Sequence, residues 1–194
     1  MLLETMRMAL KSTLLLYVMI CMFSCSMTGS YELREEYASF LGKKIHIPYR
    51  KMTVLSVKND SVSSKKEDNS DYVYVSYINS TACTPCHLSR VNEWEDIITL
   101  FEKANLPINI IIIYAVNENN ISEIRRSYIA NGCLRDVYLD ISNAFEMTNE
   151  SLPEDIRLHT FLLNTQCQVV LLGDPTRNAK IRDLVKDYIK TIEK

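Results

Sequence analysis

The run Tyr72-Val73-Tyr74-Val75-Ser76-Tyr77-Ile78 leads through a short loop into Cys83-Thr84-Pro85-Cys86. Strands favour the β-branched and aromatic side chains that fill residues 72–78. After the cysteines, apolar residues recur at helical spacing, at Leu88, Val91, Trp94, Ile98 and Phe101. The pattern predicts a strand followed by a helix, with two cysteines at their junction.

Two cysteines separated by two residues at the start of a helix can close a small, reversible disulfide ring. The N-terminus of a helix carries partial positive charge and unpaired N–H groups, which favour the thiolate of the first cysteine. Cys83 and Cys86 are therefore the candidate catalytic residues. We expect a redox-active pair rather than a static structural disulfide.

The composition narrows the class of protein. At 194 residues, with 47% hydrophobic and 24% charged residues, the chain suits one globular domain with a short extra segment. A net charge of −2 provides no basic surface for nucleic acid. The sequence contains no glycine-rich nucleotide loop and no HExxH motif, so nucleotide-binding and zinc-protease functions have no support.

The first 24 residues have the pattern of a signal peptide. Arg7 and Lys11 precede an apolar run at 13–23, which is too short to span a bilayer comfortably. Ser24 and Cys25 follow, and this ending resembles a bacterial lipoprotein box, in which the cysteine is lipidated and becomes the new N-terminus. The alternative is an uncleaved anchor with Cys25 buried. Under either interpretation the rest of the chain enters a compartment where disulfides persist.

We expect three regions along the chain. Residues 1–24 form the signal peptide, 25–70 a lipid-attached tether with a small extension, and 71–194 the main domain. The extension is predicted to hold a helix at 31–41, a hairpin of 44–48 with 53–57, and a polar loop at 59–71. The main domain is predicted to contain strand 72–78, helix 84–104, strand 108–114, helix 119–130, strand 137–139, a helical turn at 142–149, a hairpin of 159–163 with 169–172, and helix 177–192.

This order, with the cysteine pair at the first strand–helix junction, resembles the thioredoxin fold, an α/β fold with a central mixed sheet flanked by helices. Residues 71–192 resemble the extracytoplasmic thiol–disulfide oxidoreductases of the TlpA/ResA type, especially lipid-anchored thioredoxin-like proteins. The likeness rests on the cysteine motif and on Thr160-Phe161-Leu162-Leu163-Asn164 ahead of Val169-Val170-Leu171-Leu172-Gly173. It implies that Cys83 attacks the substrate disulfide, that Cys86 resolves the mixed disulfide, and that no bound cofactor is needed.

Two positions depart from the family pattern. Ala82 stands where the family usually has tryptophan, and Leu158 stands where it has the cis-proline of the substrate-docking loop. A non-proline cis bond costs about 2.5–4 kcal/mol, so we expect the Arg157–Leu158 bond to be trans. The resemblance then implies weak activity toward generic disulfides, because Leu158 and His159 present a different backbone edge to the substrate.

The same residues allow other interpretations. With His87, the cysteine motif also matches the attachment signature of c-type haem, and Met147 would be a second axial ligand. Cytochrome c domains are mostly helical, so the strands around the motif favour no haem. A metal-transfer protein would combine the cysteines with His46 or His159, but we assign no metal site.

The predicted function is dithiol–disulfide exchange by a lipid-anchored protein of the cell envelope, facing the periplasm or the exterior. The expected partners are a protein thiol or disulfide, a membrane-side redox partner and, through Cys25, the membrane. The alternative is a catalytically weak thioredoxin-like protein that binds a partner or transfers a metal. The leucine at position 158 favours this alternative and the intact cysteine pair opposes it. Cys133 and Cys167 form a second disulfide, a relay pair or free thiols, of which we expect free thiols.

Overall fold

The computed structural model describes residues 31–56, 72–82, 84–106, 108–133 and 135–192. The chain divides into two compact units, Met1–Ser39 and Phe40–Lys194. The predicted helix at 31–41 is confirmed, and it runs over residues 31–40. The predicted signal peptide, the lipid site at Cys25, the polar loop at 59–71 and Cys83 itself lie outside the described residues.

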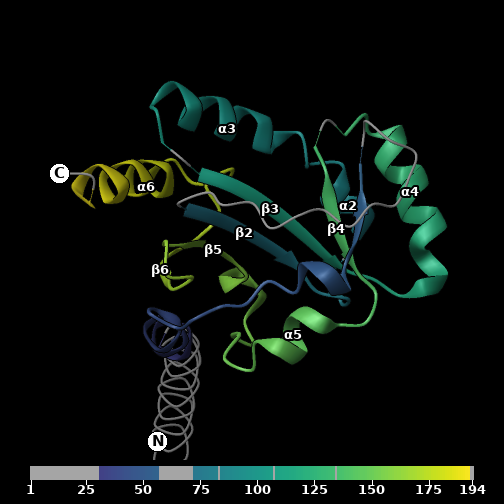
Figure 1. Cartoon of the computed structure of the whole chain (residues 1–194), viewed down its shortest axis with the longest axis horizontal. Coiled ribbons are helices and arrows are strands. Elements are labelled where there is room, and N and C mark those ends of the chain that lie inside the picture. Colours follow the sequence, from purple (N-terminus) through teal and green to yellow (C-terminus); the bar gives the residue numbers. More distant parts are fainter. Residues whose placement is uncertain (1–30, 57–71, 83, 107, 134, 193–194) are drawn as a thin grey trace, which may run out of the picture. The chain divides into compact units, whose positions relative to one another are not determined.

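The second unit is built on a mixed sheet of six strands in the order β1-β4-β3-β2-β5-β6 (Figure 1). The strands are β1 (Thr53–Leu55), β2 (Tyr72–Ile78), β3 (Ile108–Ala115), β4 (Val137–Asp140), β5 (Thr160–Leu163) and β6 (Val169–Leu172). β2, β3 and β4 are parallel, and the remaining neighbours are antiparallel. The C-terminal ends of the three parallel strands therefore lie side by side at one end of the sheet, where β5 begins.

Four helices cover one face of this sheet: α2 (Thr84–Leu88), α3 (Glu93–Lys103), α4 (Ile121–Ala130) and α6 (Ala179–Ile192) (Figure 1). The short turn η2 (Glu118–Asn120) leads directly into α4. Alternate strand residues such as Tyr74 and Ile112 pack with Trp94, Phe101 and Val185 of the helices in one apolar cluster. This alternation is the expected period of a strand, and it leaves the intervening residues for the other face.

The opposite face is covered by α5 (Ala144–Thr148) and by an irregular segment at 40–52, which includes the turn η1 (Tyr49–Lys51) (Figure 1). Four apolar residues of that segment are buried, namely Phe40, Ile45, Ile47 and Met52. The Phe40 ring packs edge-on against Phe161 of β5, with 5.2 Å between the ring centroids. The segment at 40–52 therefore contributes to the hydrophobic core on this face of the sheet.

The predicted hairpin of 44–48 with 53–57 is wrong. Lys44 forms an antiparallel bridge with Gln168, and β1 pairs with β4 at the other edge of the sheet. Strands this short have little pairing preference of their own, so burial of their apolar residues decides where each is placed. The stretch from 40 to 55 thus crosses the sheet: its first residues lie against the outer side of β6, and its end supplies β1, the short edge strand on the opposite side. Short edge strands and covering segments limit pairing with other chains.

The predicted helix 84–104 is interrupted, since α2 ends at Leu88 and α3 begins at Glu93. Between them the N–H of Arg90 donates to His87 and that of Val91 donates to Leu88, three residues back rather than four. This tighter winding is typical of short connecting turns. It rotates α3 relative to α2, and both Leu88 and Val91 are buried.

The other main-domain elements match the predictions to within a few residues, and the hairpin of β5 with β6 is confirmed. Its turn is held by Asn164, whose side-chain oxygen accepts hydrogen bonds from the N–H groups of Gln166 and Gln168 at 3.0 and 2.9 Å. Asparagine commonly supports such turns by bonding to the backbone two residues ahead.

Candidate functional site

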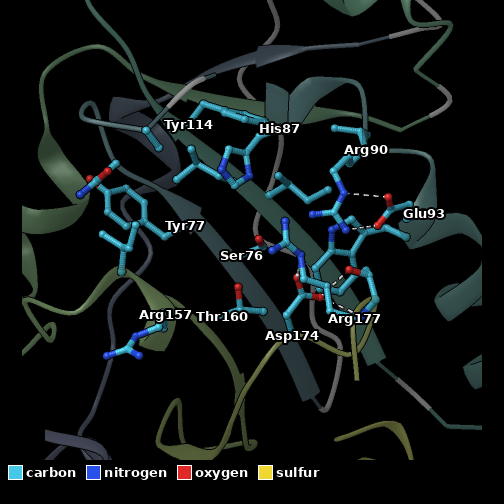
Figure 2. A pocket seen from close by; sticks show the side chains of 18 residues that line it. Ser76, Tyr77, His87, Arg90, Glu93, Tyr114, Arg157, Thr160, Asp174 and Arg177 are labelled. Carbon is cyan, nitrogen blue, oxygen red and sulfur yellow. Dashed lines mark hydrogen bonds and ion pairs between the residues drawn. The ribbon is translucent and has the colours of Figure 1, made fainter. Parts of the chain in front are cut away.

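The second cysteine of the motif lies at the end of the sheet where the parallel strands terminate. Cys86 lies on α2 and is exposed. It is disulfide-bonded, and its partner lies outside the described residues. Its carbonyl accepts a hydrogen bond from the Ser89 hydroxyl at 2.8 Å. The next residue, His87, is half-buried and turns toward a pocket (Figure 2).

The predicted docking loop lies at the same end of the sheet, directly before β5. Leu158 ends the turn η3 (Ile156–Leu158) and is buried. The described residues contain no cis peptide bond, so the expectation of a trans Arg157–Leu158 bond is confirmed. The carbonyl of His159 accepts a hydrogen bond from the N–H of Tyr77 at 2.9 Å, which ties this loop to β2.

The His159 ring packs against the Tyr77 ring and is only 3% exposed. Its Nε2 lies 2.8 Å from the carbonyl oxygen of Pro153, and its Nδ1 has no hydrogen-bond partner among the described residues. A carbonyl oxygen only accepts, so Nε2 carries the proton. Within the described part of the chain, no three His, Cys, Asp or Glu side chains gather as metal ligands do.

A pocket of about 350 Å³ lies between the helical layer and this end of the sheet (Figure 2). Ala82 and His87 both line it, and these residues flank the motif immediately before its first cysteine and after its second. The floor comes from β2, β3 and β5, and the walls come from α2–α3 and from the loop between β6 and α6. Its size is at the lower end of the range for ligand pockets, roughly 300–1,000 Å³.

Two neighbouring hydroxyl groups line the floor. Ser76 of β2 and Thr160 of β5 are directly paired across the antiparallel strands, so their side chains lie on the same face. Neither hydroxyl has a hydrogen-bond partner in the part of the chain that the structure describes. Neither oxygen is among the fully buried unpaired atoms of the described chain, so both hydroxyls are open to the pocket and available to a molecule that enters it.

The loop between β6 and α6 is rigidly held. Gly173 has φ +129°, and a Cβ there would approach the Ile181 side chain to 2.7 Å, so only glycine fits. Its carbonyl accepts a hydrogen bond from the Tyr74 hydroxyl at 2.6 Å. Asp174 then accepts hydrogen bonds from the Thr176 N–H at 2.8 Å and from the Thr176 hydroxyl at 2.6 Å.

Charged side chains surround the pocket in pairs. Arg90 and Glu93 form a two-point ion pair on the helical side, and the Arg177 Nε lies 3.6 Å from Asp174 in the loop between β6 and α6 (Figure 2). Burial and, after it, the nearby Arg90 lower the pKa of His87, while Asp174 opposes this change. His87 is therefore neutral at pH 7.

Cys133 and Cys167 are both free, as expected. Cys133 is buried and its thiol lies 3.5 Å from the carbonyl of Leu88 at the end of α2. Burial raises the pKa of the Cys133 thiol, which makes it a poor nucleophile. Cys167 is exposed in the β5–β6 turn, with φ +60°.

Solved structures with a similar backbone identify the fold. The thioredoxin domain of a thiol–disulfide oxidoreductase from Bacteroides vulgatus matches with a TM-score of 0.50 and 13% identity, over 77% of this chain and 97% of that one. Peroxiredoxin Q from Xanthomonas campestris matches with a TM-score of 0.50 and 14% identity, over 79% and 99% of the two chains. The chain has a thioredoxin-like fold. The prediction of an α/β thioredoxin-like fold is therefore confirmed.

Sequence comparison is less informative, since no protein-family model and no curated protein matches the chain. At 13% and 14% identity, the likeness to these two solved structures establishes the thioredoxin-like fold and leaves the reaction to the residues of this chain. No helix among the described residues is long and apolar enough to cross a membrane.

The sequence did not single out the pocket residues Ser76, Thr160 and Arg177. A signal was present at Ser76, which is a polar residue within an otherwise apolar and aromatic strand. Thr160 and Arg177 carried no comparable signal, because only the sheet order brings β5 and the β6–α6 loop beside β2.

Proposed function

We propose that this protein exchanges dithiols and disulfides through Cys83 and Cys86 on the outer side of the cytoplasmic membrane. The observation that carries the proposal is the exposed, disulfide-bonded Cys86, placed on a helix that follows a central parallel strand of a thioredoxin-like fold. A cysteine there is accessible to a substrate and close to the helix start that favours the thiolate of Cys83.

The reaction balances as two successive exchanges. The Cys83 thiolate attacks one sulfur of a substrate disulfide, forms a mixed disulfide with it and releases the other sulfur as a thiolate. Cys86, as a thiolate, then attacks the Cys83 sulfur and releases the second substrate thiol. The substrate gains two electrons and the protein becomes the Cys83–Cys86 disulfide, and the reverse sequence oxidises a dithiol. A membrane-side thiol partner restores the starting state.

Trapping of the mixed disulfide tests this proposal. In the full chain, Cys86→Ser should accumulate a covalent adduct with a disulfide substrate, because the attack by the second cysteine is lost. Cys83→Ser should form none, and Cys167→Ser is the matched control, since Cys167 is also exposed but lies in a turn. Adducts of equal yield in the Cys83→Ser and Cys86→Ser variants would contradict the assigned roles.

The trans bond before Leu158 favours slow exchange with generic disulfides, because the loop before β5 differs from that of the thioredoxin-like oxidoreductases which the sequence resembles. Insulin reduction should therefore be slower than with an ordinary thioredoxin. Equal rates would show that Leu158 does not limit docking.

We also expect that no haem is attached to the cysteine motif. Absorption spectra of protein matured with a cytochrome c assembly system should contain no Soret band.

The anchor is proposed separately. We expect a lipid on Cys25, which places the second unit at a membrane surface in the cell envelope. Replacement of Cys25 by alanine should release the chain from membranes or block its processing. Unchanged processing and membrane retention would instead indicate a plain signal anchor.

A further inference from the structure

The pocket beside the motif offers hydrogen-bonding groups that the described chain does not use. The hydroxyls of Ser76 and Thr160 lie side by side on its floor, and the His87 ring lies on the helical side (Figure 2). None of the three has a side-chain hydrogen-bond partner among the described residues. Grouped polar atoms without partners, at the wall of a cavity, are a binding arrangement for a ligand that can satisfy them.

The cations of the pocket differ in how fully they are neutralised. Arg90 directs two of its nitrogens to the two oxygens of Glu93, which is a complete two-point pair. Arg177 has only a 3.6 Å contact from its Nε to Asp174. One oxygen of that carboxylate is already engaged twice by Thr176. The terminal nitrogens of Arg177 therefore keep donors available, and a guanidinium matches a carboxylate in a two-point geometry.

We propose that this pocket is a carboxylate-binding subsite, which receives an acidic side chain of the disulfide substrate. Arg177 is the anchor, and the hydroxyls of Ser76 and Thr160 donate to the same carboxylate. The assignment to a substrate side chain rests on the proposed function, because Ala82 and His87 join the pocket to the cysteine motif. In an extended peptide each residue advances about 3.3 Å, so the acidic residue is sought at the positions nearest the substrate cysteine on either side.

The subsite is organised before the ligand arrives. The loop that carries Arg177 is held by the Thr176 bonds to Asp174 and by a bond from Arg182 to the carbonyl of Pro175 at 2.6 Å. Such rigidity lowers the entropy lost on binding.

Because neutral glutamine has the shape of glutamate, a comparison of these two residues in a peptide isolates the charge that Arg177 recognises.

Binding can be measured without any redox step. Trp94 is the single tryptophan of the chain and lines the pocket, so its fluorescence reports occupancy. The probes are capped peptides in which serine replaces the substrate cysteine, with Glu or Gln at each of the three positions before or after it. At the best position the full chain should bind the Glu peptide about three- to tenfold more tightly than the Gln peptide.

The Arg177→Gln variant should reduce this preference to about one, because it removes the anchor charge. Arg157→Gln is the matched control, since Arg157 also lines the pocket and is similarly exposed, but it is paired with Asp155 within its own turn. That variant should keep the preference. Equal affinity for Glu and Gln peptides at every position, or an unchanged preference in Arg177→Gln, would overturn the subsite.

Exchange with the cystine forms of the same peptides separates the two proposals. A higher kcat/KM for the Glu form, lost in Arg177→Gln, supports both. Exchange at equal rates for the two forms contradicts the subsite and leaves the exchange function standing. A fluorescence preference for Glu without any exchange retains a carboxylate site and contradicts the exchange function.

Discussion

The two faces of the central sheet treat their polar side chains in opposite ways. Beside α5, the buried carboxylate of Asp140 accepts hydrogen bonds from the N–H groups of Ala144 and Phe145, both at 2.8 Å. On the helical face, the hydroxyls of Ser76 and Thr160 have no partner among the described residues. The bonds to Asp140 stabilise the fold, because they pair a buried carboxylate with backbone donors. The hydroxyls of Ser76 and Thr160 are open to the pocket and stay available for binding.

The difference extends to what covers each face. The helical face is covered by long amphipathic helices, which leave a pocket at the end of the parallel strands. The other face is closed by α5 and by residues 40–52, with apolar side chains inserted against the strands. Residues 40–55 thus complete the sheet that carries the motif, which a division of the chain at residue 71 would interrupt.

The largest effect is expected from removing that cover. A chain that begins at residue 71 loses the buried side chains of Phe40, Ile45, Ile47 and Met52. Each contributes about 1.5–3 kcal/mol by burial, and together they approach the whole stability of a typical domain. We expect no cooperative urea transition for this chain, whereas a chain that begins at residue 40 should unfold cooperatively. A cooperative transition in the shorter chain would show that the cover is dispensable.

The next effect is expected at the loop that carries Arg177. Gly173→Ala places a Cβ 2.7 Å from Ile181 at a backbone angle that alanine rarely adopts. The free energy of unfolding should fall by about 3 kcal/mol, and the preference for Glu peptides should fall with it. Gly132→Ala is the control, because a Cβ there meets nothing within 4 Å although φ is also positive, at +57°. Similar losses in both variants would point to backbone angle alone.

A third test removes a satisfied polar group from the closed face. The Asn149 side chain accepts from the N–H of His46 and donates to its carbonyl, both at 2.8 Å, so it joins the covering segment to α5. Asn149→Ala should cost about 2 kcal/mol in thermal or urea unfolding, because backbone groups lose their partners. Asn117→Ala, at an exposed asparagine with no cap hydrogen bond, should change stability by less than about 0.5 kcal/mol.

Truncation of a polar side chain on the helical face should leave stability unchanged and should weaken binding. Ser76→Ala removes a hydroxyl that has no partner in the described chain, so stability should change by less than about 0.5 kcal/mol or should rise. The preference for Glu over Gln peptides should nevertheless fall, as measured by Trp94 fluorescence. A large loss of stability in Ser76→Ala would remove the contrast between the faces.

The smallest effect concerns pH. The pKa of His87 lies below its ordinary value of 6.5, so the ring is neutral at pH 7 and gains a positive charge only as the pH falls below that value. The peptide carboxylate, with a pKa of about 4.3, is still mostly ionised at pH 5, so the Glu preference, measured from pH 7 down to pH 5, should rise as His87 gains its charge. His87→Gln should make the preference independent of pH in this range. An unchanged slope in that variant would exclude His87 as the titrating group.

Local patterns were sufficient for the strands 72–78 and 108–114, the hairpin of β5 with β6 and the last helix. The strands and the last helix have a clear periodicity of apolar residues, and the hairpin contains a turn-forming residue, Asn164. Their local sequence is therefore enough to predict them. The helix that carries Cys86 was predictable for the same reason, because helical spacing follows the central strand in the sequence.

Long-range packing decided the rest. Residues 44–48 and 53–55 have no local preference strong enough to select a partner, so burial against the sheet placed them at its opposite edges. The pocket arises in the same way. Ser76, Thr160 and Arg177 are separated by long stretches of chain, and only the pairing of β2 with β5 and the glycine turn after β6 bring them together. A local pattern cannot encode that proximity, because it depends on which strands pair and not on the residues adjacent in sequence.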